Sequence, residues 1–290
     1  MAATTPEAPH VELPAEDAGP SEIFSPQGGM APIIAIGGLK SDITPWVVYS
    51  PMLSGDTVSP MTARERFKPI LKGGMASIDE MYKHMEEGFE EAHDELGEPI
   101  VVASQSLGGF FATKLAVEHP EKIAAVVCLA GVQAGLPRWK PAARILKQAL
   151  GNPETAKDLL EDSAHIAEHK EKVANEWSPN TALHLISPTT DMLVPIQQGL
   201  KLELPPGQEP EKRVVVPRFV PDAVSRRVLG IPDDAELIQN SLWVADHFNI
   251  AWTPAVISYI RKVRREAASS TVPVAAESSP RAAALELAHA

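Results

Sequence analysis

The sequence predicts an α/β fold with a mostly parallel central sheet and helices on both faces. Short apolar runs rich in Ile, Val and Ala alternate along the chain with longer segments of helical periodicity. The runs are apolar at consecutive positions, as expected of strands that helices cover on both faces. Strands that alternate with helices of this length also imply βαβ crossovers, which make consecutive strands parallel.

Four apolar runs are the predicted strands of this sheet. They cover residues 32–36, 99–103, 122–130 and, as the weakest of the four, 183–187. The first three runs end in glycine or serine, which are common turn residues. The Pro-rich segment 192–232 shows no clear period, and no element is predicted there.

Three helices are predicted, over residues 78–96, 107–118 and 254–265. The first has an apolar stripe at spacings of three, four or seven, formed by Ile78, Tyr82, Met85, Phe89 and Leu96. Ser77 and Glu80 precede and open that helix with the spacing of a capping box. The second helix is expected to stop before Pro120.

These elements define the predicted domain organisation. Residues 23–131 and 183–266 form the core, and residues 132–182 are read as two or three helices inserted as a cap over the carboxyl edge of the sheet. Residues 1–22 and 267–290 are rich in Ala, Pro, Ser, Thr and Glu and are predicted to be tails. The alternative for the last segment is a short helix around residues 281–288.

Composition excludes several classes of protein. The 290 residues carry 26 basic and 38 acidic side chains, a net charge of −12 that argues against a nucleic-acid partner. One cysteine, Cys128, excludes an internal disulfide framework and a cysteine-built zinc site. The longest apolar run, 123–132, falls well short of the roughly 20 residues of a membrane span. With no basic and apolar leader at the start, we expect a cytoplasmic protein without an integral membrane segment.

The segment Val101–Gly109 carries the strongest chemical signal. A buried strand runs through a tight turn directly into a helix, with Ser106 at the turn and the small residues Ser104 and Gly108 two positions away on either side. This is the layout of a nucleophile elbow, which holds a hydroxyl out of the sheet at a helix N-terminus. The N–H of Leu107 is then free to bind a developing oxyanion. The alternative is a Ser/Gly-rich turn without chemistry.

On these residues the chain resembles the α/β-hydrolase superfamily, most closely its lipase- and esterase-like serine members. The usual Gly-x-Ser-x-Gly is here Ser104-Gln105-Ser106-Leu107-Gly108, with serine in place of the first glycine. The resemblance spans about residues 30–265 and implies the α/β-hydrolase fold. It also implies the order Ser, Asp, His for the catalytic residues along the chain.

A serine nucleophile needs a base, and His247 is the candidate among nine histidines. It stands after a plausible final strand and before the last helix, where the superfamily carries its base. Its alternative role is that of a packed histidine beside aromatic residues. Of the other histidines, four lie in acidic helical patterns and are expected to be solvated: His84, His93, His165 and His169.

The third member is expected to be a carboxylate after the strand that follows the cap. Asp191 stands there, in an Asp-x-x-Val-Pro context similar to the acid loop of the superfamily. Its role would be to accept a hydrogen bond from His247 and fix the tautomer of the ring. The alternative is a turn aspartate. The competing carboxylates are Asp222, Asp233, Asp234 and Asp246.

The second oxyanion donor is expected in the loop after residues 32–36. Gly37-Gly38-Leu39 resembles the His-Gly-x turn of the family, and the N–H of Leu39 is the first choice, with that of Gly38 second. An ordinary glycine turn is the alternative. With Leu107, Leu39 completes the predicted oxyanion hole.

The predicted function is therefore cleavage of a carboxylic ester by a serine hydrolase, through an acyl-enzyme. The expected substrate is a small, apolar acyl ester, and the alternatives on the same residues are a thioesterase, an amidase or an acyltransferase. A non-catalytic binding protein with this fold is a further alternative. No cofactor and no metal are expected, although His165 and His169 have the i, i+4 spacing of helical metal ligands. The oligomeric state is not predicted.

Overall fold

The computed structural model describes residues 29–37, 58–60, 77–137, 157–217, 222–240, 245–247 and 249–270. In this part of the chain one sheet has the strand order β2-β1-β3-β4-β5-β6-β7, and every neighbouring pair is parallel. The strands are β1 (Ile33–Ile36), β2 (Val58–Pro60), β3 (Ile100–Gln105), β4 (Ile123–Leu129), β5 (Ala182–Pro188), β6 (Glu211–Pro217) and β7 (Glu236–Asn240). The helices are α4 (Ile78–Leu96), α5 (Leu107–Glu118), α8 (Ala164–Glu176), α9 (Ile196–Gly199), α10 (Asp222–Leu229), the 3₁₀ turn η2 (Ile250–Trp252) and α11 (Pro254–Ser270).

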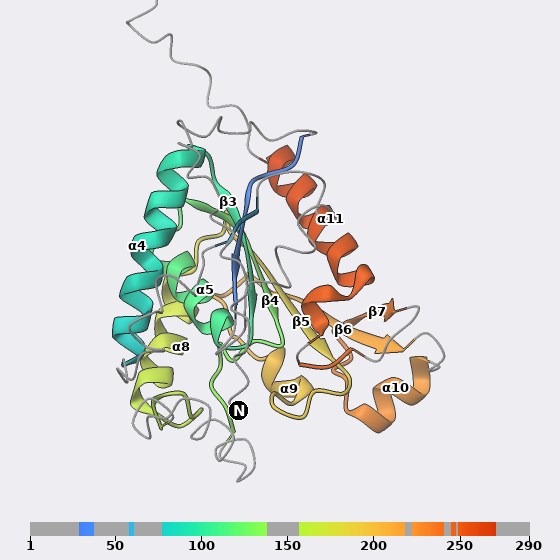
Figure 1. Cartoon of the computed structure of the whole chain (residues 1–290). Coiled ribbons are helices and arrows are strands. Elements are labelled where there is room, and N and C mark those ends of the chain that lie inside the picture. Colours follow the sequence, from blue (N-terminus) through green and yellow to red (C-terminus); the bar gives the residue numbers. More distant parts are fainter. Residues whose placement is uncertain are drawn as a thin grey trace, which may run out of the picture.

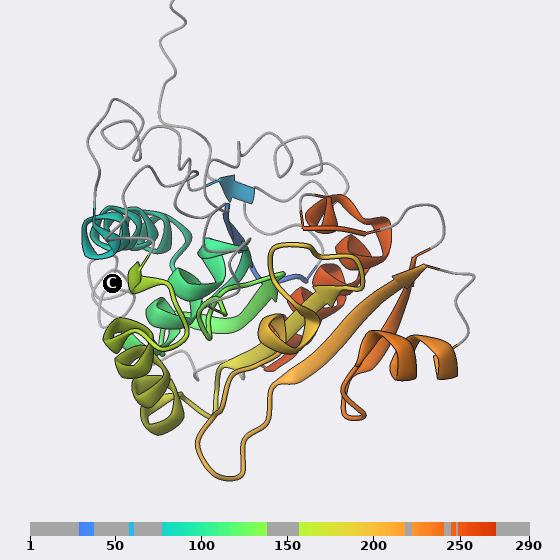
Figure 2. The ribbon, with the colours of Figure 1, turned by 90° about the horizontal axis from the view of Figure 1, so that it is seen from below.

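Helices cover both faces of the sheet, as the sequence predicts. Alternate residues of each strand point to opposite faces, so Ile34 and Val102 belong to one core cluster and Ile33 and Val101 to the other. The first cluster packs under α4, α5 and α8, and the second packs under α11. Figures 1 and 2 show the sheet between these two helical layers.

The predicted strands and the predicted helices are confirmed. The four predicted strands correspond to β1, β3, β4 and β5, and the three predicted helices to α4, α5 and α11. The capping box at the start of α4 is present: the Ser77 hydroxyl accepts the Glu80 N–H at 3.2 Å, and the Glu80 carboxylate accepts the Ser77 N–H at 2.8 Å. The apolar stripe of α4 faces the sheet, because Ile78, Met85 and Phe89 are buried in the first cluster.

The cap prediction needs correction at residues 164–176. These residues form α8, which packs against α5 in the helical layer on one face of the sheet. Ile166 and Val173 are fully buried in the first cluster, and the ring of His169 lies 4.6 Å from that of Phe110. Residues 138–156 of the predicted cap lie outside the described residues. The predicted tail boundary at residue 267 is also wrong, because α11 continues to Ser270 with Ala267 buried.

Three strands have no predicted residue range, although a final strand before His247 was expected. β2 is only three residues long, and β7 is the edge strand at the other end of the sheet, where most of its residues are only partly buried or exposed. β6 begins with the charged residues Glu211, Lys212 and Arg213, so only three consecutive valines mark it as apolar. β6 and β7 therefore lack the uniform burial of the central strands, and uniform burial is what produces a continuous apolar run in the sequence.

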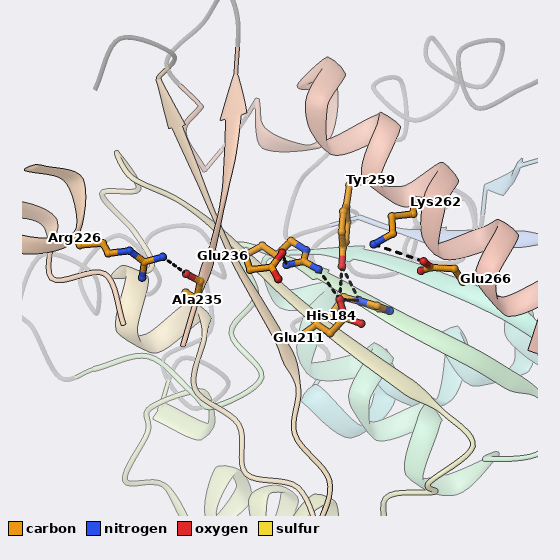
Figure 3. Close-up of polar contacts among 9 residues, drawn as sticks. His184, Glu211, Arg226, Ala235, Glu236, Tyr259, Lys262 and Glu266 are labelled. Carbon is orange, nitrogen blue, oxygen red and sulfur yellow. Dashed lines mark hydrogen bonds and ion pairs between the residues drawn. The ribbon is translucent and has the colours of Figure 1, made fainter. Parts of the chain in front are cut away.

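A polar network fastens α11 to the amino ends of β5 and β6 (Figure 3). The buried ring of His184 bonds the hydroxyl of Tyr259 at 2.9 Å, and that hydroxyl donates to the Glu211 carboxylate at 2.9 Å. Arg213 donates to the same carboxylate at 2.7 Å and lies over the Tyr259 ring. The His184 ring, whose Nδ1 lies 3.5 Å from the carboxylate, lowers the pKa of Glu211 to about 2, together with the hydrogen bond from Tyr259 and the charge of Arg213.

This network predicts a specific acid sensitivity. A carboxyl group whose pKa is depressed on folding stabilises the protein above its unfolded-state pKa and loses that contribution as the pH falls through the folded value. The Glu211 contribution is therefore lost between about pH 4.5 and pH 2. We expect Glu211→Gln to lower the free energy of unfolding at pH 7 by less than about 1 kcal/mol, because solvent screens this half-exposed group. Urea unfolding from pH 7 to pH 2 should give a shallower acid decline for the variant, and parallel curves would contradict the assignment.

None of the helices in the described ranges is both long enough and apolar enough to cross a membrane. The cytoplasmic location expected from the sequence stays a prediction.

Candidate active site

Three sequence-predicted residues meet at the carboxyl edge of the sheet. Ser106 directly follows β3, Asp191 lies three residues after β5, and His247 lies between β7 and η2. The carboxyl ends of parallel strands lie at one edge of a sheet, where open α/β folds bind their ligands. The sheet therefore brings together side chains that are separated by up to 141 residues of sequence.

Ser106 occupies a strained turn between β3 and α5. Its φ is 54° and its ψ is −122°, a region that side-chain-bearing residues rarely adopt. The Ser106 N–H donates to the Leu129 carbonyl of β4 at 3.0 Å. Its own carbonyl accepts the N–H groups of Gly109 at 2.9 Å and Val132 at 3.1 Å. These main-chain bonds hold the turn and leave the side chain partly exposed at the sheet edge.

The three side chains form a continuous line of hydrogen bonds. Ser106 Oγ lies 2.9 Å from Nε2 of His247, and Nδ1 of the same ring lies 2.9 Å from Oδ2 of Asp191. With the proton on Nδ1, the ring donates to the carboxylate and accepts the serine hydroxyl proton on Nε2. The arrangement can thus carry a proton away from the hydroxyl of Ser106.

The carboxylate of Asp191 is held rigidly. Its side chain is fully buried, and Oδ1 accepts the N–H groups of Leu193 at 2.7 Å and Val194 at 2.8 Å. The Asp-x-x-Val segment is therefore a turn closed by its own aspartate, which leaves Oδ2 for His247. Asp191 therefore closes its own turn through Oδ1 and contacts His247 through Oδ2, so the two expected roles occur together.

The competing aspartates make other contacts. Asp246 accepts the N–H of Asn249 at 2.9 Å, within its own loop. The carboxylate of Asp234 pairs with Lys212 at 2.5 Å. Asp233 is the neighbouring residue, and its main-chain carbonyl accepts from Arg226. The side chain of Asp222 lies outside the described residues.

Comparison with known proteins gives structural matches alone, because neither a family model nor a curated protein matches the sequence. The peroxisomal α/β-hydrolase of Saccharomyces cerevisiae superposes with a TM-score of 0.50 over 91% of this chain and 86% of that one, at 13% identity. This chain has the α/β-hydrolase fold. Two further matches are an S-formylglutathione hydrolase from Staphylococcus aureus (TM-score 0.46, 19% identity, 81% and 84% covered) and a monoacylglycerol lipase from Paleococcus ferrophilus (0.44, 15%, 83% and 97%).

Within this α/β-hydrolase fold, Ser104 takes the place of the usual first glycine without strain. The residue belongs to β3 and is not among the described residues with positive φ, so the position requires a small side chain but no glycine backbone. Its hydroxyl is buried and donates to the Val127 carbonyl of β4 at 3.2 Å. The departure from the Gly-x-Ser-x-Gly pattern therefore costs the elbow no strain at this position.

Gly108 allows the start of α5 to touch the end of β1. A Cβ at this position would lie 2.7 Å from the Ile36 carbonyl oxygen and 2.9 Å from that of Gly37. Leu107 is the first residue of α5, and the first N–H groups of a helix have no partner within the helix. The loop after β1 thus starts beside an N–H that has no partner within its own helix, and next to Ser106. Leu39 and Gly38, the other predicted donors, lie outside the described residues.

This close approach predicts a clear effect of Gly108→Ala. The added methyl group meets main-chain oxygens, which cannot move aside as a flexible side chain can. We expect the free energy of unfolding to fall by about 1–3 kcal/mol. Urea unfolding curves measure this change, and wild-type stability in the variant would mean that β1 and α5 are farther apart than described.

The other histidines in the described ranges have partners elsewhere than at Ser106. His169 was expected to be solvated but is buried, and its Nε2 lies 3.0 Å from the hydroxyl of Thr113. Burial, with some repulsion from Lys114, lowers the pKa of His169 to about 3, so the ring is neutral and its Nε2 is already engaged. Burial arises because α8 packs on α5, which its acidic sequence pattern does not show.

One group of possible metal ligands occurs among the described residues. Glu86, Glu118 and His119 bring three ligand atoms within 4.8 Å of one another between α4 and α5. These side chains are engaged in ion pairs and hydrogen bonds: His119 with Glu86 at 2.9 Å, and Glu118 with Lys114 and Tyr82. The group is accounted for by the contact between the two helices.

Proposed function

We propose that this protein is a serine hydrolase that cleaves carboxylic esters through an acyl-enzyme. The observation that carries the proposal is the line of hydrogen bonds from Ser106 through His247 to Asp191, at 2.9 Å for each step. A serine hydroxyl is a weak nucleophile until an adjacent base takes its proton. A base oriented by a buried carboxylate meets this need.

In the proposed reaction Ser106 Oγ attacks the acyl carbon while its proton moves to Nε2 of His247. The negative charge on the former carbonyl oxygen is stabilised by the N–H of Leu107 and, as the sequence suggests, that of Leu39. The C–O bond to the leaving alcohol then breaks, and the alcohol takes the proton from His247. Water attacks the acyl-enzyme by the same route and releases the carboxylic acid and free Ser106.

The proposed substrate is a small ester with an apolar acyl group. Thioesters, amides and transfer to another acceptor would use the same three residues, because these reactions share the acyl group and differ in the leaving group or the acceptor. The preferred leaving group is found by comparing kcat/KM for an oxygen ester, a thioester and an amide of the same acyl group, because these substrates differ in the leaving group alone.

The nucleophile is tested by covalent labelling. A fluorophosphonate probe is expected to label the wild-type protein once, and Ser106→Ala is expected to abolish the label. Ser104→Ala is the matched control, because that serine is buried two residues away and its hydroxyl is bonded to Val127. Labelling that survives Ser106→Ala would overturn the assignment of the nucleophile, and an unlabelled wild-type protein would favour a non-catalytic binding protein.

A further inference from the structure

The ring of His247 is carried by a segment outside the helices and strands. Residues 245–247 stand between β7 and η2, so regular main-chain pairing does not fix their position. Asp246 of this segment and Asn249 beyond it exchange hydrogen bonds, with each N–H donating to the side chain of the other at 2.8 and 2.9 Å. These bonds shape the segment but do not attach it to Ser106 or Asp191.

Gln105 attaches the segment to the nucleophile strand. Val101 and Ala103 of β3 face the α11 side of the sheet, and Gln105 continues that alternation. Its side chain is buried, and its Nε2 donates to the main-chain carbonyl of His247 at 2.6 Å. A buried amide is costly unless it is hydrogen-bonded, so this donor is committed to the carbonyl.

Thr190 attaches the same segment to the acid loop. Its hydroxyl donates to the main-chain carbonyl of Ala245 at 2.6 Å. The two donors thus bond carbonyls two residues apart on the segment. Gln105 immediately precedes Ser106 in the chain, and Thr190 immediately precedes Asp191.

We infer that Gln105 and Thr190 are positioning residues, which hold the main chain of residues 245–247 so that the His247 ring stays between Ser106 and Asp191. The inference rests on the proposed function for its catalytic meaning. Gln105 links the His247 segment to the residue before Ser106, and Thr190 links it to the residue before Asp191. A misplacement of about 1 Å in such an assembly can cost about 100-fold in rate.

The kinetic test removes each donor without changing the size of the side chain much. Thr190→Val replaces the hydroxyl by a methyl group, and Gln105→Met keeps an unbranched side chain without the amide. We expect each variant to lower kcat for p-nitrophenyl esters by about 10- to 100-fold with KM changed less than about 3-fold. Thr190→Ser, which keeps the donor, should recover most of the rate lost in Thr190→Val.

The matched control for Thr190 is Thr181, because Thr190 follows β5 and Thr181 precedes it. Thr181 precedes β5, and its buried hydroxyl donates to the Ile123 carbonyl at 2.9 Å, remote from the sheet edge that carries Ser106. The same hydroxyl also lies 3.5 Å from the Pro120 carbonyl, so Thr181→Val removes a hydroxyl with two carbonyl partners, and it should leave kcat within about 2-fold of wild type. An equal loss of kcat in both Thr→Val variants would assign the effect to general stability and overturn the inference.

A spectroscopic readout separates this inference from the proposed function. In protein labelled with ¹⁵N-histidine, the ring signals of His247, assigned by their loss in His247→Gln, report the position of the ring without any substrate. We expect Thr190→Val and Gln105→Met to shift or broaden them, whereas Thr181→Val leaves them unchanged. Unchanged ring signals in the first two variants would overturn the positioning role even if the protein hydrolyses esters. Shifted signals in a protein that a fluorophosphonate does not label would support positioning and refute the hydrolase.

Discussion

Asp191→Asn is expected to lower kcat for ester hydrolysis at neutral pH by about 10⁴-fold. The substitution preserves size, so the effect comes from the direction of hydrogen bonds. Oδ1 of Asp191 accepts two main-chain N–H groups, from Leu193 and Val194, while Oδ2 faces Nδ1 of His247. An asparagine must keep its oxygen toward the two N–H groups, because a flipped amide would place its NH₂ against two main-chain donors.

That orientation points the amide NH₂ of residue 191 at Nδ1 of His247. The ring nitrogen then accepts a hydrogen bond, so the neutral imidazole carries its proton on Nε2. In this tautomer Nε2 cannot take the proton of Ser106, although each atom stays near its place. We therefore expect a large loss of kcat with little change in KM and in the free energy of unfolding.

Steady-state kinetics with p-nitrophenyl esters and urea unfolding measure the two quantities. Asp246→Asn is the matched control, because an asparagine there can still accept the N–H of Asn249, and we expect it to lose less than about 10-fold in kcat. A greater loss in Asp246→Asn than in Asp191→Asn would reverse the assignment of the acid.

Local patterns explain which features the sequence predicts. The tight turn at Ser106 can be predicted because strand, turn and helix follow one another within a few residues. The fold class predicted from this alternation is confirmed. The contact between His247 and Asp191 joins residues far apart in the sequence, so no local pattern predicts it. It was expected because the resemblance to the superfamily implies the order Ser, Asp, His along the chain. Gln105 and Thr190 leave no such signal, because a side chain that bonds a distant carbonyl imposes no periodicity. The burial of His169 escapes for a related reason: the face of α8 that packs on α5 is set by tertiary contact.

Substitutions of Ser106 are expected to have the largest effect on rate and a distinctive effect on stability. Both Ser106→Ala and Ser106→Gly remove the nucleophile and should lower kcat by about 10⁵- to 10⁶-fold. The backbone of this residue, at φ 54° and ψ −122°, strains any residue that carries a Cβ but suits glycine. Such strain costs about 1–3 kcal/mol, which exceeds the roughly 0.5–1 kcal/mol that the flexibility of glycine costs in the unfolded chain.

We therefore expect Ser106→Gly to be about 1 kcal/mol more stable than Ser106→Ala, as measured by urea unfolding of the two inactive proteins. Ser104 supplies the control within the same motif, because its backbone is extended in β3. There the order should reverse, with Ser104→Gly about 0.5–1 kcal/mol less stable than Ser104→Ala. If glycine is the more stable substitution at residue 106 and alanine the more stable one at residue 104, the strain is a property of residue 106. If the glycine variant is the less stable one at residue 106 as well, the turn stores no strain, and packing alone holds the hydroxyl out.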